Sequence, residues 1–335
     1  MKDVSAESQH ESTPESGRTS SSFRLPPSSL PLHAVLNFLK PPGMTSHDAV
    51  SFVRRLAETK RVGHTGTLDP AAAGVLPICI GNATKLADYL QAGRKTYIAE
   101  ATFGTETDSL DATGETVFTG DARALNEQHI NDALAPFRGD ILQTPPLFSA
   151  VKKDGKKLYQ LAREGQSIER GEVEVAAREV QIYKLEMTRF FTHEKFPRAI
   201  FHIECGSGTY IRSLVRDIGR ALGCFATMSF LVRTQSGDFH IDNARTPQEL
   251  ESDFVSSLVP FQSALESCAS RVVTDDEVVA EYLAGRTRRS REAENKHRTS
   301  DERLLFVDAA RRHGLLCDGQ TSKLFHLQNL QEDKT

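Results

Sequence analysis

The sequence predicts an α+β protein in which strands and helices alternate irregularly around a large core. Apolar residues make up 39% of the 335 residues, enough for one large domain and a smaller one beside it. Short apolar or alternating runs typical of strands lie between segments with helical spacing, without a regular strand–helix repeat. This order favours α+β over a doubly wound parallel sheet.

The first 32 residues are rich in Ser, Thr, Pro and Glu and lack the apolar centre of a secretory signal. Such a segment buries too little apolar surface to order itself. Its acidic residues also argue against an organelle transit peptide. We therefore expect residues 1–32 to be a disordered tail, with ordered structure beginning at the strand-like run 34–39.

Periodicity predicts the elements that follow. Ser46 is the expected cap of a helix that carries Val50 and Val53 on one face. Residues 95–103 alternate as a half-buried strand, and 209–222 has the apolar stripe of an amphipathic helix. The other expected elements are helices at 126–135 and 156–164 and strands at 173–186, 198–205 and 225–239.

The pattern loosens at 240–272, where Thr246–Pro247 predicts the start of a short helix. We place a domain boundary at 265–272, which separates a large domain, 33–265, from a small module, 272–335. The module is expected to hold a helix from Val272 onward, with Val278, Val279 and Leu283, and strands at 304–307 and 314–317.

Composition excludes several classes of protein. No apolar run approaches the roughly 20 residues that span a bilayer, so no membrane partner is expected. The net charge of −4 means that any nucleic-acid surface must be local. Five cysteines without C-x-x-C spacing indicate reduced thiols in a cytoplasmic protein. The histidines form no H-x-x-x-H pair, and we expect neither a metal nor a cofactor.

The most informative stretch is Gly63–Pro77, which carries the carboxylate of Asp69 in a segment rich in Gly and Pro. Glycine and proline direct the backbone there, and the residue before a proline is pushed toward extended geometry. Asp69 is thus held at a bend where it can meet a ligand. The alternative is structural, with Asp69 as a helix N-cap, Pro70 in the first turn and Ala71–Ala73 as helix.

The run GHTGTLDPAAAGVLPICIG resembles the catalytic loop of the TruB family of tRNA pseudouridine synthases, in which the Asp of G-x-L-D-P is catalytic. Other segments resemble further motifs of the family in the same order. Leu39 and Gly206 depart from the family's usual Asp and Ser. The matching segments are Lys40–Ser46 (K-P-x-G-x-[ST]-S), Arg94–Tyr97 (K-x-Y), Gln143–Gly165 (Q-x-P-P-x-x-S-A onward), Cys205–Arg212 (C-S-x-G-T-Y-I-R) and Leu231–Thr234 (L-x-R-T).

The resemblance implies roles for individual residues. Asp69 is the implied nucleophile and Arg212 its ion-pair partner, while Tyr97 stacks on the target base and assists proton removal. Each of these segments also has a structural alternative. Lys40–Ser46 can be a plain strand-to-helix turn, Tyr97 a half-buried strand tyrosine, Leu231 a core leucine and the lysines near 152–157 a solvated charged face. The implied substrate-binding residues are His64 as a wedge, Lys40, Tyr210, Leu231, Lys152 and Lys156.

The fold implied by the resemblance is the pseudouridine synthase fold, a mixed and mainly antiparallel central sheet with flanking helices, followed by a small PUA-like β-rich module. The implied activity is isomerisation of uridine to pseudouridine at position 55 in the T-loop of tRNA. The target base is flipped out of the RNA, and no metal or cofactor takes part. The expected partner is the T-loop and stem of tRNA, bound by a monomer that requires no protein partner.

Two other functions stay open. One is an RNA-binding or tRNA-folding protein whose catalysis is secondary. The other is the same chemistry on a different RNA, guided by a separate RNA and partner proteins, although the chain lacks a long lysine-rich tail. Residues 286–298 hold six basic and two acidic side chains, a local charge of +4 that is equally compatible with a phosphate contact or a loop without such a role.

Overall fold

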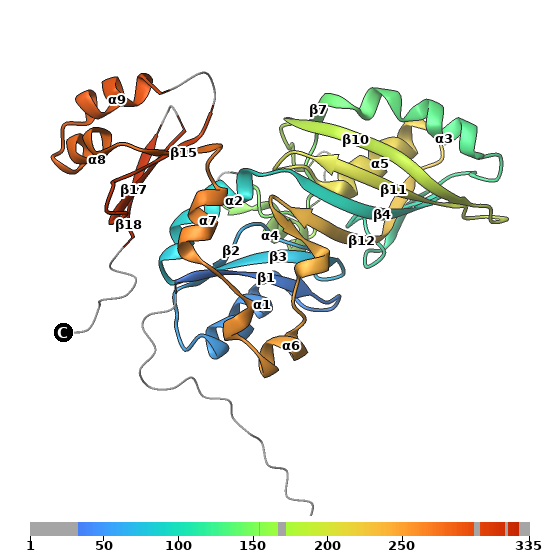
Figure 1. The fold of residues 1–335 in the computed structure, drawn as a ribbon. Helices are drawn as coiled ribbons and strands as arrows, with labels where there is room; N and C mark the ends of the chain where they lie inside the picture. Colours follow the sequence, from blue (N-terminus) through green and yellow to red (C-terminus); the bar gives the residue numbers. More distant parts are fainter. Residues whose placement is uncertain (1–32, 154, 167–171, 298–301, 319–320, 328–335) are drawn as a thin grey trace, which may run out of the picture.

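The computed structural model describes residues 33–327, apart from 154, 167–171, 298–301 and 319–320 (Figure 1). The tail expected at 1–32 lies outside the described residues. No described helix is long and apolar enough to cross a membrane. All five cysteines are buried thiols.

The main sheet is mixed and mainly antiparallel, as the sequence resemblance implied. Its strands follow one another in the order β14-β1-β3-β12-β4-β11-β10-β7, with β2 beside β3 and β13 beside β12. Their bounds are β14 Leu258–Pro260, β1 Ala34–Lys40, β3 Ala73–Ile80, β12 Ala226–Ser236, β4 Lys95–Phe103, β11 Arg198–Cys205, β10 Arg178–Phe191, β7 Gly139–Gln143, β2 Val62–His64 and β13 Phe239–His240.

The antiparallel order of the main sheet is interrupted where β12 pairs with β3. These two strands are parallel, the one parallel pairing among the described strands of this sheet, and they pair Val232 with Ala73 and Arg233 with Gly74. Gly74 has φ +113°, and a Cβ there would lie 2.2 Å from the carbonyl oxygen of Arg233. Only glycine allows the two backbones to approach this closely. The junction sets the loop before β3 against β12, where Arg233 donates to the carbonyl of Gly66 at 3.2 Å.

The first helix, α1 (Ser46–Leu56), is capped by Thr45 and not by Ser46 as the sequence suggested. Thr45 has extended backbone angles, and it forms a reciprocal capping box with Asp48. The Ser46 hydroxyl instead donates to the carbonyl of Leu68 and accepts from its N–H, both at 2.9 Å. Ser46 therefore anchors the loop that carries Asp69.

The amphipathic helix expected at 209–222 is α5 (Ile211–Ala221), and Leu214, Val215 and Ile218 on it are buried. They share a core with Ile130 of α3 and with the inward residues of the central strands. The remaining helices are η1 Gly81–Leu86, α2 Ala87–Ala92, α3 Glu127–Ala133, η2 Ala135–Phe137, α4 Leu158–Arg163, η3 Ile241–Asn243, α6 Pro247–Ser252, η4 Val255–Ser257 and α7 Phe261–Ser267.

Several strands depart from the sequence-based expectation. The run after Asp69 is strand β3, so Ala71–Ala73 does not form the helix of the structural alternative. Strand β10 begins at Arg178 instead of 173, because Val173 packs against Leu147 and Leu158 in a small separate cluster. Strands β3 and β7 were not expected.

The C-terminal residues form a β-rich module, as expected, built on a four-stranded sheet with the order β15-β16-β17-β18. The helix expected from Val272 starts only at Asp276, because Asp275 caps it and the residues before it form a strand. Strand β18 was also not expected. The bounds are β15 Arg271–Thr274, α8 Asp276–Leu283, α9 Thr287–Asn295, β16 Leu304–Val307, β17 His313–Cys317 and β18 Ser322–His326.

The module shares a hydrophobic core with the large domain. One face of its sheet is covered by Val278 and Val279 of α8. The other face packs against residues of β1, β3 and α7 (Figure 1). This core contains Val35, Val75, Cys79, Leu86, Phe261, Leu265, Leu305, Val307, Leu316 and Phe325.

Candidate active site

Asp69 lies in the turn between β2 and β3, and three contacts fix this turn. The Asp69 carbonyl accepts from the N–H of Ala72 at 3.1 Å, and the Pro70 carbonyl accepts from the N–H of Gly43 at 2.8 Å. The Lys40 ammonium also donates to the Pro70 carbonyl, at 3.3 Å. The backbone is thereby held while the Asp69 side chain remains about one-third exposed (32%).

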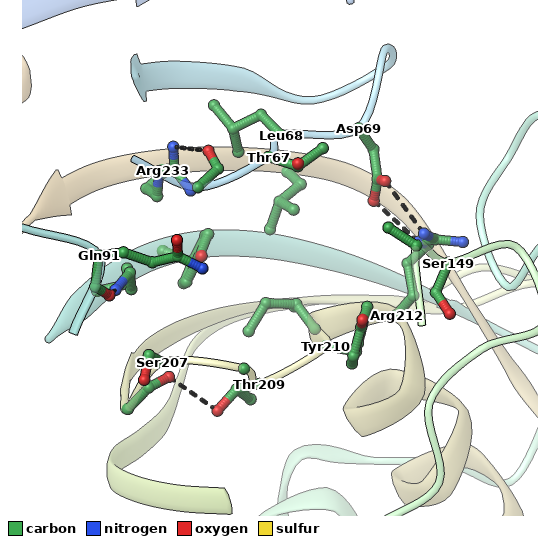
Figure 2. A pocket seen from close by; sticks show the side chains of 18 of the residues that line it. Thr67, Leu68, Asp69, Gln91, Ser149, Ser207, Thr209, Tyr210, Arg212 and Arg233 are labelled. Atoms are coloured by element: carbon green, nitrogen blue, oxygen red, sulfur yellow. Dashed lines mark hydrogen bonds and ion pairs between the residues drawn. The ribbon is translucent and has the colours of Figure 1, made fainter. Parts of the chain in front are cut away.

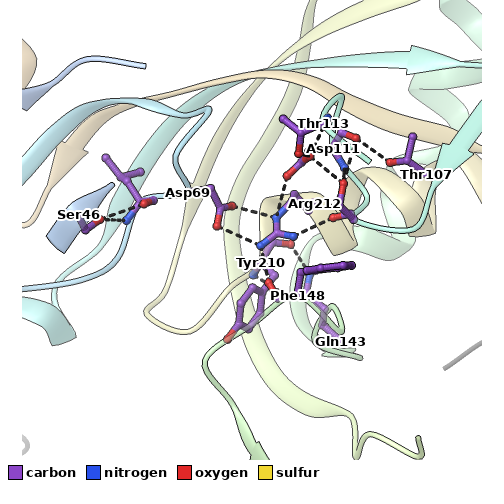
Figure 3. Close-up of polar contacts among 11 residues, drawn as sticks. Ser46, Asp69, Thr107, Asp111, Thr113, Gln143, Phe148, Tyr210 and Arg212 are labelled. Carbon is purple, nitrogen blue, oxygen red and sulfur yellow. Dashed lines mark hydrogen bonds and ion pairs between the residues drawn. The ribbon is translucent and has the colours of Figure 1, made fainter. Parts of the chain in front are cut away.

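Arg212 binds both oxygens of the Asp69 carboxylate. Its Nε lies 2.9 Å from Oδ2 and its Nη2 lies 3.1 Å from Oδ1 (Figure 3). Arg212 is buried in the first turn of α5, and its other contacts are to the carbonyls of Ser109 at 2.8 Å and Phe148 at 2.9 Å. A bidentate pair of this kind orients a carboxylate as well as attracting it.

A second carboxylate, that of the buried Asp111, stands behind Arg212. Its Oδ2 lies 3.9 Å from the Arg212 Nε, and its Oδ1 accepts from the hydroxyls of Ser109 at 2.8 Å and Thr113 at 2.5 Å. Nothing in the local sequence distinguishes Asp111 from its acidic neighbours, so the sequence analysis missed it. Its hydrogen bonds hold the loop whose Ser109 carbonyl binds Arg212.

A cavity of about 480 Å³ opens beside the Asp69–Arg212 pair (Figure 2). It is large enough for one nucleotide and has both polar and aromatic walls. Five of the nine expected site residues line it: Asp69, Tyr97, Tyr210, Arg212 and Leu231. The other four are His64, Lys40, Lys152 and Lys156, which do not line it.

Arg233 lies at the end of the cavity opposite Arg212 in Figure 2, and Tyr97 also lines the cavity. Burial raises the pKa of the Tyr97 phenol, although the nearby Arg233 charge partly opposes this. Arg233 is itself almost fully buried and donates to the carbonyls of Val75 at 2.7 Å and Gly66 at 3.2 Å. The L-x-R-T match contained Arg233, but only Leu231 was assigned a role there.

Lys40 is completely buried beneath the Asp69 loop. In addition to Pro70, its ammonium donates to the carbonyls of Pro41 at 2.9 Å and Met44 at 2.7 Å. Burial lowers its pKa to about 8, and the Asp69 charge partly offsets this. Lys40 thus supports the loop from below and is shielded from solvent.

His64 ends β2, where its Nδ1 accepts from the N–H of Gly66 at 3.2 Å. Burial lowers its pKa, which favours the neutral form of the ring. Lys152 and Lys156 lie on a short hairpin, β8 (Lys152–Lys153) and β9 (Lys156–Lys157), and Lys156 pairs with Glu164 at 3.1 Å. The hairpin leads directly into α4.

Gln143 holds Tyr210 by its backbone. The Gln143 Oε1 accepts from the Tyr210 N–H at 2.8 Å, and its Nε2 donates to the Tyr210 carbonyl at 3.1 Å (Figure 3). Gln143 is 1% exposed. The Ser213 hydroxyl donates to the Thr144 carbonyl at 2.9 Å. The segment after β7 is therefore tied to the start of α5.

No metal site is evident in this part of the molecule. Among the described residues, no group of three His, Cys, Asp or Glu side chains is arranged to hold an ion. The polar side chains at the cavity are the Asp69–Arg212 ion pair, those of Arg233, Lys95 and Gln91, and several hydroxyls.

The mixed sheet, the Asp-bearing turn and its arginine partner define the class of pseudouridine synthases. Solved structures share the fold: a chain of "Crystal Structure of a Cbf5-Nop10-Gar1 Complex" superposes with a TM-score of 0.57 at 23% identity. That alignment covers 90% of this chain and 81% of the other. At this identity the likeness concerns the fold alone.

Sequence comparison identifies the family. Residues 54–211 match the N-terminal domain of the TruB family pseudouridylate synthases, and 212–266 match the tRNA pseudouridylate synthase B C-terminal domain. A tRNA pseudouridine synthase B of Alkaliphilus oremlandii is 47% identical over 244 residues, 72% of this chain and 78% of that protein. One from Listeria monocytogenes is 43% identical over 286 residues, 83% and 91%. The chain belongs to the TruB family, enzymes that isomerise uridine to pseudouridine.

Proposed function

We propose that the protein converts uridine at position 55 in the T-loop of tRNA to pseudouridine, with Asp69 as the catalytic carboxylate. The observation that carries this proposal is the bidentate Asp69–Arg212 pair at a cavity of about 480 Å³. The relatives named tRNA pseudouridine synthase B support tRNA as the substrate.

The proposed reaction starts with attack of the Asp69 carboxylate on C1′ of the target ribose. The C1′–N1 bond breaks, and the electron pair leaves with the uracil ring. After the ring turns, a C1′–C5 bond forms and the bond to Asp69 breaks. The C5 proton is then lost, and N1 carries a proton in the product. Arg212 orients the carboxylate for the first step.

The base-binding part of the cavity is proposed to be the wall formed by Tyr97, Leu231 and Arg233. A flat phenol and a leucine side chain suit stacking on a uracil ring that has been flipped out of the RNA. The raised pKa of Tyr97 keeps its phenol protonated at neutral pH. This favours stacking over proton acceptance in the unliganded enzyme.

The RNA surface is proposed to include the Lys152–Lys157 hairpin next to the cavity. Lys152 is exposed, and Tyr159, which follows the hairpin on α4, lines the cavity. Elsewhere on the surface, the Arg94 guanidinium lies 3.9 Å from the ring centre of the exposed Tyr183. A cation stacked on an aromatic ring is suited to contacts with single-stranded bases and phosphates.

The small module 272–335 is proposed to assist tRNA binding, but its basic stretch is partly neutralised. Arg286 makes a bidentate pair with Glu281 at 2.6 and 3.0 Å, and Lys296 lies 3.9 Å from Glu277. Both acidic residues belong to α8. Phosphate contacts by this stretch would therefore compete with ion pairs inside the module.

Replacement of Asp69 by Asn tests the proposal. Asn keeps the size of Asp but cannot act as a nucleophile, so pseudouridine formation should fall more than about 1,000-fold. Asp132→Asn, on the exposed face of α3, is the matched control. Purified protein alone is incubated with unmodified tRNA, and pseudouridine 55 is mapped by mass spectrometry. Wild-type activity in Asp69→Asn would refute the assignment, and inactivity of the purified wild type would show that a further partner is needed.

A further inference from the structure

Three buried hydroxyl groups have no hydrogen-bond partner among the described residues: those of Thr65, Ser149 and Ser236. Of the three, only Ser149 lines the cavity beside Asp69. Ser149 is 6% exposed, so water has little access to it. A buried polar group without a partner is unfavourable, and within a cavity it indicates a partner supplied by the ligand.

The backbone around Ser149 is held in place. Its N–H donates to the carbonyl of Leu147 at 2.9 Å, and its carbonyl accepts from the N–H of Tyr159 at 3.1 Å. The hydroxyl is thus presented by a segment that is anchored on both sides, which is what a selective contact requires.

Ser149 and Asp69 lie at the same end of the cavity because one guanidinium nitrogen connects them. The Arg212 Nη2 donates to Asp69 Oδ1 at 3.1 Å and to the carbonyl of Phe148, the residue before Ser149, at 2.9 Å. Figure 2 shows Ser149 next to this ion pair and away from Arg233. A group bound at Asp69 therefore comes close to Ser149.

We propose that the Ser149 hydroxyl hydrogen-bonds the 2′-hydroxyl of the target nucleotide and so selects ribose over deoxyribose. The proposal rests on the proposed action of Asp69 at C1′. The neighbouring carbon, C2′, carries the 2′-hydroxyl, which both donates and accepts hydrogen bonds, as a serine hydroxyl does. The 2′-hydroxyl is also the group that distinguishes RNA from DNA at a single nucleotide.

The test is a cycle of two proteins and two substrates. The substrates are T-arm stem-loops with either uridine or 2′-deoxyuridine at the target position, and the proteins are the wild type and Ser149→Ala. Affinity for the ribose form is the half-saturating enzyme concentration in single turnover. Affinity for the deoxyribose form is its inhibition constant against the ribose form.

Ser149→Ala should weaken binding of the ribose form about 3- to 10-fold, the usual effect of one hydrogen bond, and leave the deoxyribose form within about 2-fold. Ser149→Cys, which keeps nearly the same volume, should behave in the same way. Ser236→Ala removes an equally buried, unpartnered hydroxyl outside the cavity and should change neither affinity.

Equal losses on both stem-loops would overturn the proposal, since the hydroxyl would then serve the base or the fold. A wild type that binds both stem-loops equally would overturn it as well. Failure of the proposed function itself is recognised separately, because the wild type would then leave the ribose stem-loop unmodified.

Discussion

Arg212 holds both carboxylate oxygens of Asp69, at 2.9 and 3.1 Å, although the two residues are 143 positions apart in the chain. The pair joins the β2–β3 turn to the first turn of α5. Because Arg212 also binds the carbonyls of Ser109 and Phe148, its single guanidinium connects four separate segments. The site therefore exists only once these segments have packed together.

Replacement of Arg212 by Met should lower the single-turnover rate at least about 100-fold, because it leaves a partly buried carboxylate without its counter-charge. Arg212→Lys keeps the charge but loses the two-pronged geometry, so an intermediate loss is expected. Arg123→Met is the control, since Arg123 makes the same bidentate contact with Asp121 at the surface. An unchanged rate in Arg212→Met would mean that another group orients Asp69.

Gln143→Leu should destabilise the protein by about 1–3 kcal/mol, because the N–H and carbonyl of Tyr210 lose their buried partner. Tyr210 lines the cavity, so the half-saturating tRNA concentration should also rise. Thermal unfolding and single-turnover kinetics measure the two effects. Gln128→Leu, on the exposed face of α3, is the control. If neither quantity changes in Gln143→Leu, the amide does not position Tyr210.

Gly74→Ala should destabilise the protein strongly, since the added Cβ would lie 2.2 Å from the Arg233 carbonyl oxygen at the β3–β12 junction. Gly155→Ala is the matched control, because Gly155 also has a positive φ, +83°, but nothing lies within 4 Å of its Cβ position. The control should lose only about 1–2 kcal/mol from backbone strain. Equal melting temperatures for the two variants would contradict the close approach at the junction.

The buried Lys40 ammonium should make the free energy of unfolding depend on pH. Its pKa is lowered to about 8 in the folded protein, from an ordinary value of 10.5 in the unfolded chain. Between these pH values the unfolded chain binds more protons, so the Lys40 contribution to the free energy of unfolding rises with pH. Below pH 8 both states are protonated and the contribution is constant. Chemical denaturation of wild type and Lys40→Met at pH 7 to 10 measures the difference. An identical pH profile in both would contradict burial of the charged amine.

Truncation after Leu265 should destabilise the large domain in addition to weakening tRNA binding. The β-rich module covers Val35, Val75 and Cys79, which the truncation would expose together with Phe261. A lower melting temperature, together with a weaker salt dependence of tRNA affinity, is the expected result. An unchanged melting temperature would mean that the two cores are independent.

Local patterns were sufficient for much of the fold. The strands β4 and β11 coincide with the expected ranges, and α5 begins within two residues of the expected start. These elements have strict periodicity, which reflects burial of one face. Strand β3 was missed because its buried residues form a nearly continuous apolar run with Gly and Pro, and α8 starts late because Asp275 is a stronger cap than any residue before it.

The sequence by itself determined which motifs are present: those around Asp69, Tyr97 and Arg212 could be recognised because they lie in short contiguous runs. Only the tertiary structure decided how these runs meet. Lys40 turned out to lie beneath the loop, and Asp111 joined the site without any local signal. Gln143, Ser149 and Arg233 lie in matched motifs, but their places in the site appeared only in the folded structure. The physical reason is that their burial and hydrogen bonds depend on partners distant in the chain, which become neighbours only when the sheet and α5 pack around one cavity.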